Sequence, residues 1–179
     1  MFKMIQRARS QKGFTLIELL IVVAIIGIIA AILIPNLLDA LQKAKQKRTV
    51  GDIRSVGTAW FSWLTDQVGA ASAGANQYSF SFTGGPMTGD QLLSTLYSSA
   101  SMFYIQKVPN NDGWGNGYHY EAALTPLEDK VMGIRSSGRD GTFPSASYTM
   151  GPFVATNYGQ DIVWADGFFV RYPAGAQVD

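Results

Sequence analysis

The chain has 179 residues, a formal net charge of +1 and no cysteine. A net charge so close to zero produces no strong positive field, so we expect no nucleic-acid partner. The absence of cysteine excludes disulfides and thiol chemistry, and a single histidine excludes histidine-rich metal sites. The length suits one globular domain with an additional anchoring segment.

A short basic segment, residues 1–13, precedes a long apolar run. From Leu19 to Ile34 no side chain is charged or strongly polar. Counted from Phe14, the apolar segment has about 21 residues and would be roughly 32 Å long as a helix. This length crosses a bilayer core of about 30 Å. We therefore expect residues 14–35 to form a helix that spans a lipid bilayer.

Glu18 is the one acidic residue in this expected span. An ionised carboxylate near hydrocarbon is costly and indicates a functional role with a specific partner. If the chain were cut after Gly13, the free amine of Phe14 would lie one helical turn from Glu18, on the same face. In a bundle of such helices, the amine of one subunit could pair with Glu18 of its neighbour and fix their register. Alternatively, Glu18 reaches the lipid headgroups from the membrane edge.

Two further features of the anchor leave alternatives open. The basic start and apolar run resemble a secretory signal, for which Ala30 and Ala31 would form a poor cleavage site. Cleavage there would release a soluble protein. Charge does not decide the orientation of the span, because basic residues lie on both sides of it. Those that follow the span are Lys43, Lys45, Lys47, Arg48 and Arg54.

Beyond the span, the helical pattern continues. Pro35 removes one backbone donor, so we expect a kink or local melting between Ala31 and Pro35. Apolar residues then recur largely at spacings of three or four, which indicates one buried face of an amphipathic helix over residues 36–68. These residues are Ile53, Val56, Trp60, Trp63 and Leu64. We predict one helix from about Phe14 to about Val68, with both tryptophans in the core.

Residues 69–179 are predicted to form a globular head. We expect a short strand at Tyr78–Thr83 and a helix at Asp90–Ala100. Further strands are expected at residues 118–121, 130–136 and 159–172, the last of them as a hairpin around Asp166-Gly167. The predicted fold class is α+β, with three or four short antiparallel strands packed on the amphipathic half of the long helix.

The segment around Gly13 resembles a known processing site. The sequence Lys12-Gly13-Phe14-Thr15-Leu16-Ile17-Glu18-Leu19, between a basic leader and an apolar helix, is similar to that of bacterial type IV prepilins and of the pseudopilins of type II secretion. The resemblance implies cleavage between Gly13 and Phe14 by a prepilin peptidase, N-methylation of Phe14, and a role for Glu18 in filament assembly.

The same resemblance implies a pilin-like fold and a homo-oligomeric filament. Subunits would wait in the inner membrane as single-pass proteins, with the head outside the cytoplasm. An inner-membrane assembly platform would add them to a filament in the periplasm or at the cell surface. The predicted function is therefore structural rather than enzymatic, and the sequence has no phosphate-binding loop or paired-carboxylate motif that would indicate otherwise.

The head carries a second resemblance, to the major (G-type) pseudopilin of type II secretion. Asp112-Gly113-Trp114-Gly115-Asn116-Gly117-Tyr118-His119-Tyr120 is similar to that subunit's Asp-Pro-Trp-Gly-Asn-Pro-Tyr-X-Tyr segment, with glycines in place of both prolines. Ser137–Gly141 resembles its Gly-X-Asp-Gly turn, and Asp161–Trp164 resembles its Asp-Ile-X-X-Trp ending, one residue short.

A calcium site follows from this second resemblance. It implies that Asp140 and Asp161 are carboxylate ligands, and calcium takes six to eight oxygens, so backbone carbonyls or waters would have to supply the others. The intervening loop, Thr142–Tyr158, is long for the family and contains no acid. Alternatively, Asp140-Gly141 and Asp166-Gly167 are only turns.

Two other functions fit the family resemblance. One is a type IV pilus pilin used in adhesion or motility, although many such pilins close a loop with a disulfide, which this chain cannot form. The other is a membrane-anchored minor pilin that binds a ligand. A surface patch of aromatic residues would serve that binding, namely Tyr104, Trp114, Tyr118 and Tyr120.

Overall fold

The structure is a computed structural model, and it consists of two compact units. The first unit ends at Ala40 and the second begins at Leu41. The predicted strand at Tyr78–Thr83 lies outside the described residues. Those described are residues 13–72, 87–97, 104–122, 132–145 and 147–176.

One helix, α1 (Leu16–Ser72), contributes to both units. Its bounds lie within a few residues of the predicted helix, which is the usual uncertainty at helix ends. The helix is continuous through Pro35, so the predicted local melting is wrong. Proline removes only one backbone hydrogen bond, and the neighbouring turns are strongly apolar helix-forming sequence. A kink at Pro35 stays a prediction.

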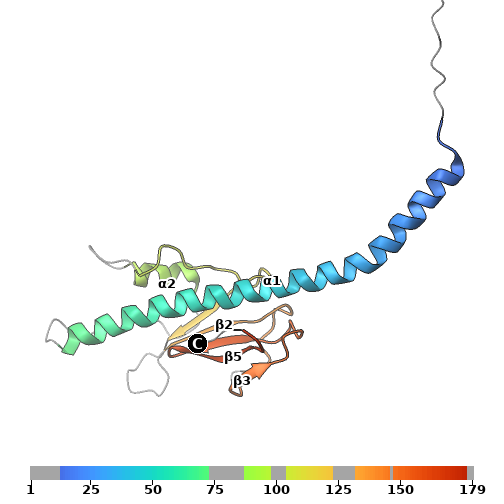
Figure 1. Ribbon diagram of the computed structural model, residues 1–179. Coiled ribbons are helices and arrows are strands. Elements are labelled where there is room, and N and C mark those ends of the chain that lie inside the picture. Colours follow the sequence, from blue (N-terminus) through green and yellow to red (C-terminus); the bar gives the residue numbers. More distant parts are fainter. Residues whose placement is uncertain (1–12, 73–86, 98–103, 123–131, 146, 177–179) are drawn as a thin grey trace, which may run out of the picture. The chain divides into compact units, whose positions relative to one another are not determined.

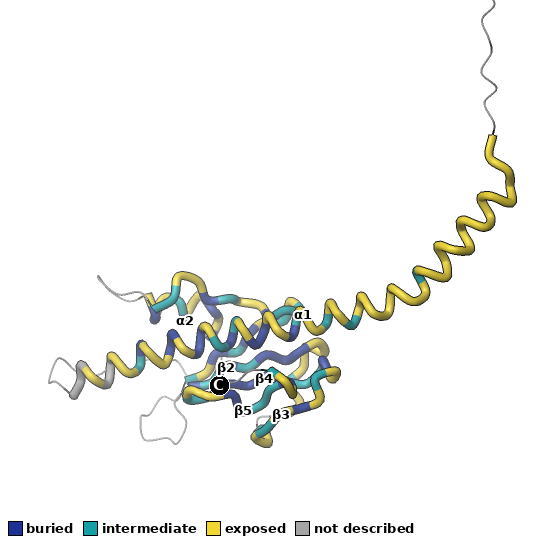
Figure 2. The backbone as a smooth tube through the Cα atoms, viewed as in Figure 1, coloured by how far each residue is buried: buried dark blue, intermediate teal, exposed yellow. Residues whose placement is uncertain are grey.

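The first half of α1 is exposed nearly all round within the single chain (Figure 2). Its large apolar side chains are between about half and four-fifths exposed, for example Leu16 at 81% and Ile21 at 50%. A helix that is apolar on every side requires lipid or other helices around it. Among the described residues, this segment therefore finds no packing partner within its own chain.

The head contains a five-stranded sheet in the order β1-β2-β4-β5-β3, of which Figure 1 labels β2, β5 and β3. The strands are β1 (His119–Ala122), β2 (Met132–Ser136), β3 (Gly151–Phe153), β4 (Ile162–Ala165) and β5 (Phe168–Pro173). The predicted α+β class is confirmed, but the sheet is mixed rather than antiparallel, because β3 pairs with β5 in parallel. β3 lies inside the segment that the sequence predicted as a loop.

The turn between β4 and β5 confirms the predicted hairpin. Asp166 has a φ of 49° and Gly167 a φ of 103°. Two consecutive residues with positive φ are typical of the two-residue hairpin turn that an Asp-Gly pair favours. The turn pairs Ala165 of β4 with Phe168 of β5, so β5 follows β4 directly as the next strand of the sheet.

The core of the head forms where the second half of α1 packs on the sheet. Trp60 is fully buried and Trp63 is 8% exposed, which confirms the predicted core role of both. A Cβ atom at Gly57 would lie 2.6 Å from the Trp164 ring, so the missing side chain allows helix and sheet to approach closely. The short helix α2 (Gly89–Leu96) adds Leu92 and Leu96 to the same core.

The predicted aromatic surface patch is wrong. Tyr118 and Tyr120 are 4% and 1% exposed, because the start of β1 directs them into the core. Their hydroxyls donate inward, from Tyr118 to Asp52 at 3.3 Å and from Tyr120 to the Pro109 carbonyl at 2.6 Å. Burial raises the pKa of both phenols, so both remain neutral core residues.

Candidate functional site

The predicted cleavage site lies in exposed chain ahead of α1. Gly13 and Phe14 precede the first helical residue, and the Phe14 side chain is 87% exposed. A Cβ atom at Gly13 would meet no atom within 4 Å beyond its chain neighbours. Contacts within the described chain therefore do not require glycine here, and such a requirement would have to come from an enzyme that recognises this bond.

Glu18 caps the start of α1 together with Thr15. The Thr15 amide and hydroxyl both donate to Glu18 Oε2 at 2.8 Å, and the Glu18 amide donates to Thr15 Oγ1 at 3.3 Å. This reciprocal arrangement is a capping box, which satisfies amides at a helix start that have no partner in the helix. It holds the Glu18 carboxylate at the helix start through one oxygen.

Thr15→Ala is expected to loosen this cap. Loss of the hydroxyl removes the acceptor for the Glu18 amide and costs about 1 kcal/mol, which should speed exchange of that amide roughly fivefold. Hydrogen exchange of the full chain in micelles measures this directly. Thr15→Ser keeps the hydroxyl and should exchange like the parent, whereas equal exchange in all three proteins would contradict the capping role.

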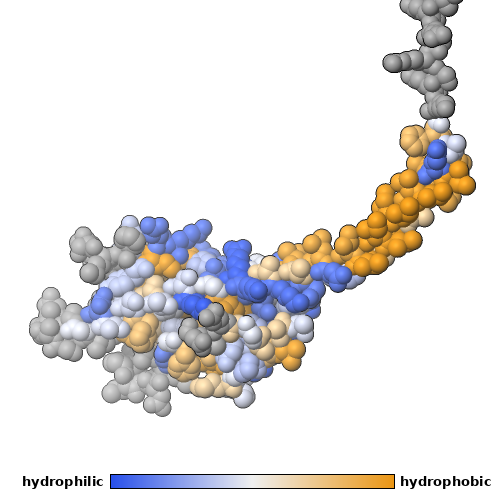
Figure 3. Space-filling view, viewed as in Figure 1, coloured by the Kyte–Doolittle hydropathy of each residue, from blue (hydrophilic) through white to orange (hydrophobic). Residues whose placement is uncertain are grey.

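The segment that follows is long and apolar enough to cross a membrane. An 18-residue window within Leu16–Asp66 reaches a mean hydropathy of 3.2, and none of it is buried inside the chain. The orange surface in Figure 3 marks this segment. By length and composition it is a candidate membrane span near the N-terminus, in which Glu18 lies close to one end.

In the head, Asp112 is the central acceptor of the loop before β1. Its side chain is 3% exposed. Oδ1 accepts hydrogen bonds from the amides of Trp114 and Asn116, both at 2.9 Å, and Oδ2 accepts from Ser136 Oγ at 2.7 Å. Since Ser136 belongs to β2, one carboxylate shapes the loop and fastens it to the sheet.

The same loop also binds α1. The Trp114 indole donates to Gln42 Oε1 at 2.7 Å, and the Gly113 amide donates to Thr49 Oγ1 at 2.9 Å. A Cβ atom at Gly113 would collide with the Lys45 carbonyl. Glycine is therefore required by the close approach, and a proline here would also remove the amide that Thr49 accepts.

Of the two predicted calcium ligands, Asp161 is the buried one, at 5% exposed. The Tyr148 hydroxyl donates to Asp161 Oδ2 at 2.6 Å, and burial raises the pKa of Tyr148 to about 12, so the hydroxyl stays protonated. Asp161 Oδ1 is buried without a hydrogen-bond partner among the described residues. Burial raises the pKa of the Asp161 carboxyl, and the charge of Asp140 raises it further.

Asp140, the other predicted ligand, is exposed and belongs to a turn. Its Oδ1 accepts from the Thr142 amide at 3.1 Å, as the turn interpretation predicts. Its Oδ2 lies 3.4 Å from where a Cβ of Gly159 would be, so the two aspartates share one neighbourhood. In the described parts of the chain no three histidine, cysteine or acidic residues form a metal-binding group, and a calcium ion would need backbone oxygens.

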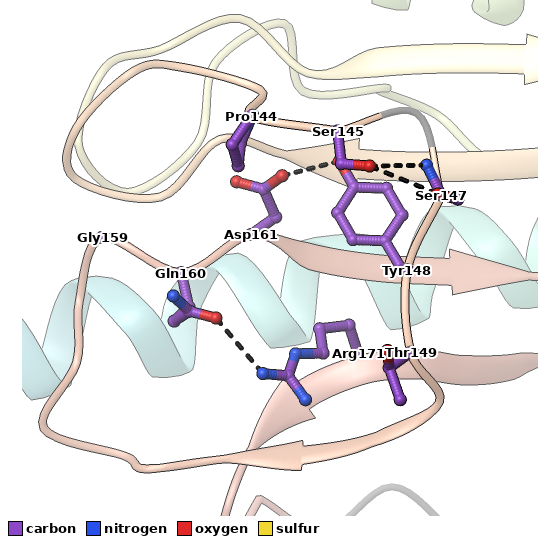
Figure 4. A pocket seen from close by; sticks show the side chains of 9 residues that line it. All are labelled: Pro144, Ser145, Ser147, Tyr148, Thr149, Gly159, Gln160, Asp161 and Arg171. Atoms are coloured by element: carbon purple, nitrogen blue, oxygen red, sulfur yellow. Dashed lines mark hydrogen bonds between the residues drawn. The ribbon is translucent and has the colours of Figure 1, made fainter.

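A small cavity of about 180 Å³ adjoins Asp161 (Figure 4). Asp161 and Tyr148 meet on one side of it, and Arg171 approaches Gln160 on the other, where Arg171 Nη2 donates to Gln160 Oε1 at 3.2 Å. The remaining lining residues are Pro144, Ser145, Ser147, Thr149 and Gly159. Most of the lining residues have polar side chains, and among the described residues the buried acceptor at this cavity that lacks a donor is Asp161 Oδ1.

Three residues that organise these sites were not predicted from the sequence to do so. Thr15 was readable as the first position of a Thr-X-X-Glu capping box before an apolar run. Asp112 and Ser136 gave no comparable signal, because their hydrogen bond joins residues 24 apart in sequence. Such a pair becomes visible only once β2 is placed beside the loop.

The fold and the candidate sites together define a class, an α+β head on a long helix whose exposed apolar front half is suited to a membrane. A profile of the prokaryotic N-terminal methylation motif matches residues 8–34. The type II secretion system core protein G of Vibrio cholerae is 32% identical over 145 residues, covering 76% of this chain and 86% of that protein. The chain belongs to the family of type II secretion system core protein G.

Other relatives extend the comparison. The core protein G of Escherichia coli K12 is 31% identical over 132 residues, covering 74% of this chain and 84% of that protein. A fimbrial protein of Pseudomonas aeruginosa is 39% identical over 108 residues, covering 59% of this chain and 64% of that protein. No solved structure matches the chain significantly.

Proposed function

We propose that this chain is a structural subunit of a type II secretion filament. A prepilin peptidase cuts between Gly13 and Phe14, and the new Phe14 amine is methylated. The subunit waits in the inner membrane with its head outside the cytoplasm, and an assembly platform adds it to a filament of identical subunits. Its function is packing rather than catalysis, as the names of its relatives suggest.

The observation that carries this proposal is the start of α1. A helix that is exposed and apolar on all sides buries its surface either in lipid or against copies of itself. Glu18 sits at its beginning with one oxygen occupied by Thr15. The other oxygen would accept the Phe14 amine of a neighbouring subunit, which would set the register between packed helices.

The comparisons favour a secretion filament over a surface pilus. The match to core protein G covers most of that protein's length, whereas the match to the fimbrial protein covers 64% of it. The pilus alternative keeps some support, because identity over that shorter region is 39%. The minor-pilin alternative loses the aromatic patch on which it rested, since Tyr118 and Tyr120 are buried.

Cleavage is expected to depend on the size of residue 13. Because a Cβ at Gly13 meets no described atom, a substitution here should leave the fold intact and report only recognition by the peptidase. We expect Gly13→Ala to be cut partly and Gly13→Trp to stay uncut when each is co-expressed with a prepilin peptidase. Loss of the leader, read from gel mobility and mass, is the measurement. Normal cutting of Gly13→Trp would exclude this site.

We also propose that Asp140 and Asp161 hold a calcium ion together with backbone carbonyls. The unpartnered buried oxygen of Asp161 and the neighbouring carboxylate of Asp140 support this fit. The neighbouring carboxylates of Asp140 and Asp161 repel one another, and a bound divalent cation would relieve that repulsion. Its contribution would be to order the loop between β2 and β4.

Calcium is expected to raise the thermal midpoint of the parent protein by several degrees, since a ligand at about 100 times its Kd adds about 2.7 kcal/mol. Asp161→Asn should lose this response. In chelator, that variant should equal or exceed the parent in stability. The reason is that burial raises the pKa of Asp161 in the folded protein. As the pH rises through that raised value, the buried carboxyl becomes charged, and the parent loses stability that the asparagine variant keeps. Scanning calorimetry with calcium, magnesium or chelator measures both effects, and an undiminished calcium response in Asp161→Asn would contradict the site.

A further inference from the structure

A group of basic residues follows the apolar half of α1. Between residues 42 and 54 the helix carries five cations and one acid, Asp52. The cations are Lys43, Lys45, Lys47, Arg48 and Arg54. If the head lies outside the cytoplasm, these cations run against the usual enrichment of basic residues on the cytoplasmic side, and they require an explanation.

Two of these cations, Lys47 and Arg48, lie on the side of the helix that faces away from the head loop. The head loop covers the opposite side, through Trp114 on Gln42 and Gly113 on Thr49. Lys47 and Arg48 are exposed. Among the described residues Lys47 has no ion pair.

In the described parts of the chain, the one ion-pair partner of Arg48 is weak. Its Nε lies 3.5 Å from Asp52 Oδ2, and its side chain remains 65% exposed. Exposed pairs of this kind contribute little to stability, because water screens them. The charge of Arg48 is therefore available to a partner outside the chain.

The position of Glu18 sets the level of these cations in a bilayer. Exposed Leu37, Leu38 and Leu41 continue the apolar surface past Pro35. From the residue after Glu18 to Leu41 the helix is about 34 Å long, which crosses a core of about 30 Å with a modest tilt. Lys47 and Arg48 then lie about 9–11 Å beyond Leu41 along the helix, where long basic side chains can bend back to the headgroups.

We propose that Lys47 and Arg48 bind the phosphate groups of anionic phospholipids in the outer leaflet. This rests on the proposed membrane anchor. The contact holds the waiting subunit at a fixed depth in the bilayer. Because these contacts are electrostatic and exposed, they break readily when the subunit leaves the membrane.

The absence of cysteine allows a direct test in the full chain. Ala44 is exposed on the same helix, so Ala44→Cys introduces a single labelling position for bimane. The protein is reconstituted in phosphatidylcholine vesicles that contain a small fraction of spin-labelled phosphatidylglycerol or spin-labelled phosphatidylcholine. Quenching of bimane reports which lipid is enriched beside the cations.

We expect phosphatidylglycerol to be enriched about fivefold over phosphatidylcholine, as one basic residue near an anionic surface would produce. The enrichment should fall with added salt, and Lys47→Gln/Arg48→Gln should remove it. The control Lys107→Gln/Arg139→Gln removes the same charge from exposed head positions and should keep the enrichment. Equal thermal midpoints would show that both variants fold.

Three results would overturn the lipid proposal. They are no enrichment in the parent, an equal loss in the control, and enrichment that survives Lys47→Gln/Arg48→Gln. If that variant kept its lipid enrichment but assembled poorly, the cations would contact neighbouring subunits instead. A chain that fails to float with neutral vesicles would remove the membrane anchor, and with it the proposed function and this proposal together.

Discussion

Glu18→Ala is expected to abolish filament assembly while the head remains folded. In the assembled filament the carboxylate would face a neighbour's Phe14 amine in a medium of low dielectric, and its removal would leave the charge of that amine without a partner. We therefore expect a large loss of assembled filament. The buried core of the head begins far along the helix, with residues such as Val50, so its stability should not change.

Glu18→Gln separates the two roles of this side chain. Glutamine can replace glutamate in a capping box, so the bond to Thr15 would survive while the charge is lost. If the ion pair matters, Glu18→Gln should assemble as poorly as Glu18→Ala. Sheared filaments and the membrane pool of subunit, both quantified by immunoblot, give the result. Normal filaments from Glu18→Gln would mean that only the cap matters.

Asp112→Ala is expected to destabilise the head by about 3–5 kcal/mol, because it leaves two amides and one hydroxyl in a buried site without their acceptor. All three bonds are short, between 2.7 and 2.9 Å. The loop that binds α1 through Trp114 and Gly113 would also lose its shape. Thermal unfolding of the detergent-solubilised chain measures the loss.

A surface acid provides the control for Asp112. Glu121 pairs with Arg135 at 3.0 Å but its side chain is 48% exposed. Glu121→Ala should therefore cost no more than about 1 kcal/mol. If Asp112→Ala were equally mild, the hydrogen bonds seen around its carboxylate would not be holding the loop in place.

The parts of the fold that follow local rules were predictable from the sequence. The spacing of Ile53, Val56 and Trp60 placed one face of α1 in the core, and all three are buried. The Asp166-Gly167 pair predicted the hairpin between β4 and β5. Both signals lie within a few residues, where helical period or turn chemistry decides the outcome.

Strand β3 shows where local rules fail. Gly151, Pro152 and Phe153 form a three-residue edge strand. Glycine and proline both weaken strand propensity, and the pairing partner, β5, lies about 20 residues further along the chain in parallel register. The local sequence of this segment does not predict a strand. It forms because β5 offers a free edge.

The candidate sites also differ in how far their local sequence predicted them. The methylation motif could be recognised because its residues are contiguous, and a profile of that motif matches residues 8–34. Cleavage between Gly13 and Phe14 and the role of Glu18 stay predictions. That Asp140 and Asp161 lie near one another could be predicted only through resemblance. The hydrogen bond from Tyr148 to Asp161 was not predicted, because it joins residues 13 apart in a loop. The prediction of an aromatic surface patch was wrong because Tyr118 and Tyr120 face the core. Their spacing in the sequence does not show which face of the strand is buried.

We propose that the mature subunit begins at Phe14. The N-terminus and intact mass of the protein, purified from its native membrane, test this start directly. We expect a chain that starts at Phe14 and is heavier by one methyl group. A chain that starts at Met1 would contradict it, because Phe14 would then have no free amine for Glu18 of a neighbouring subunit. A chain that starts near Ala31 would remove the anchor altogether.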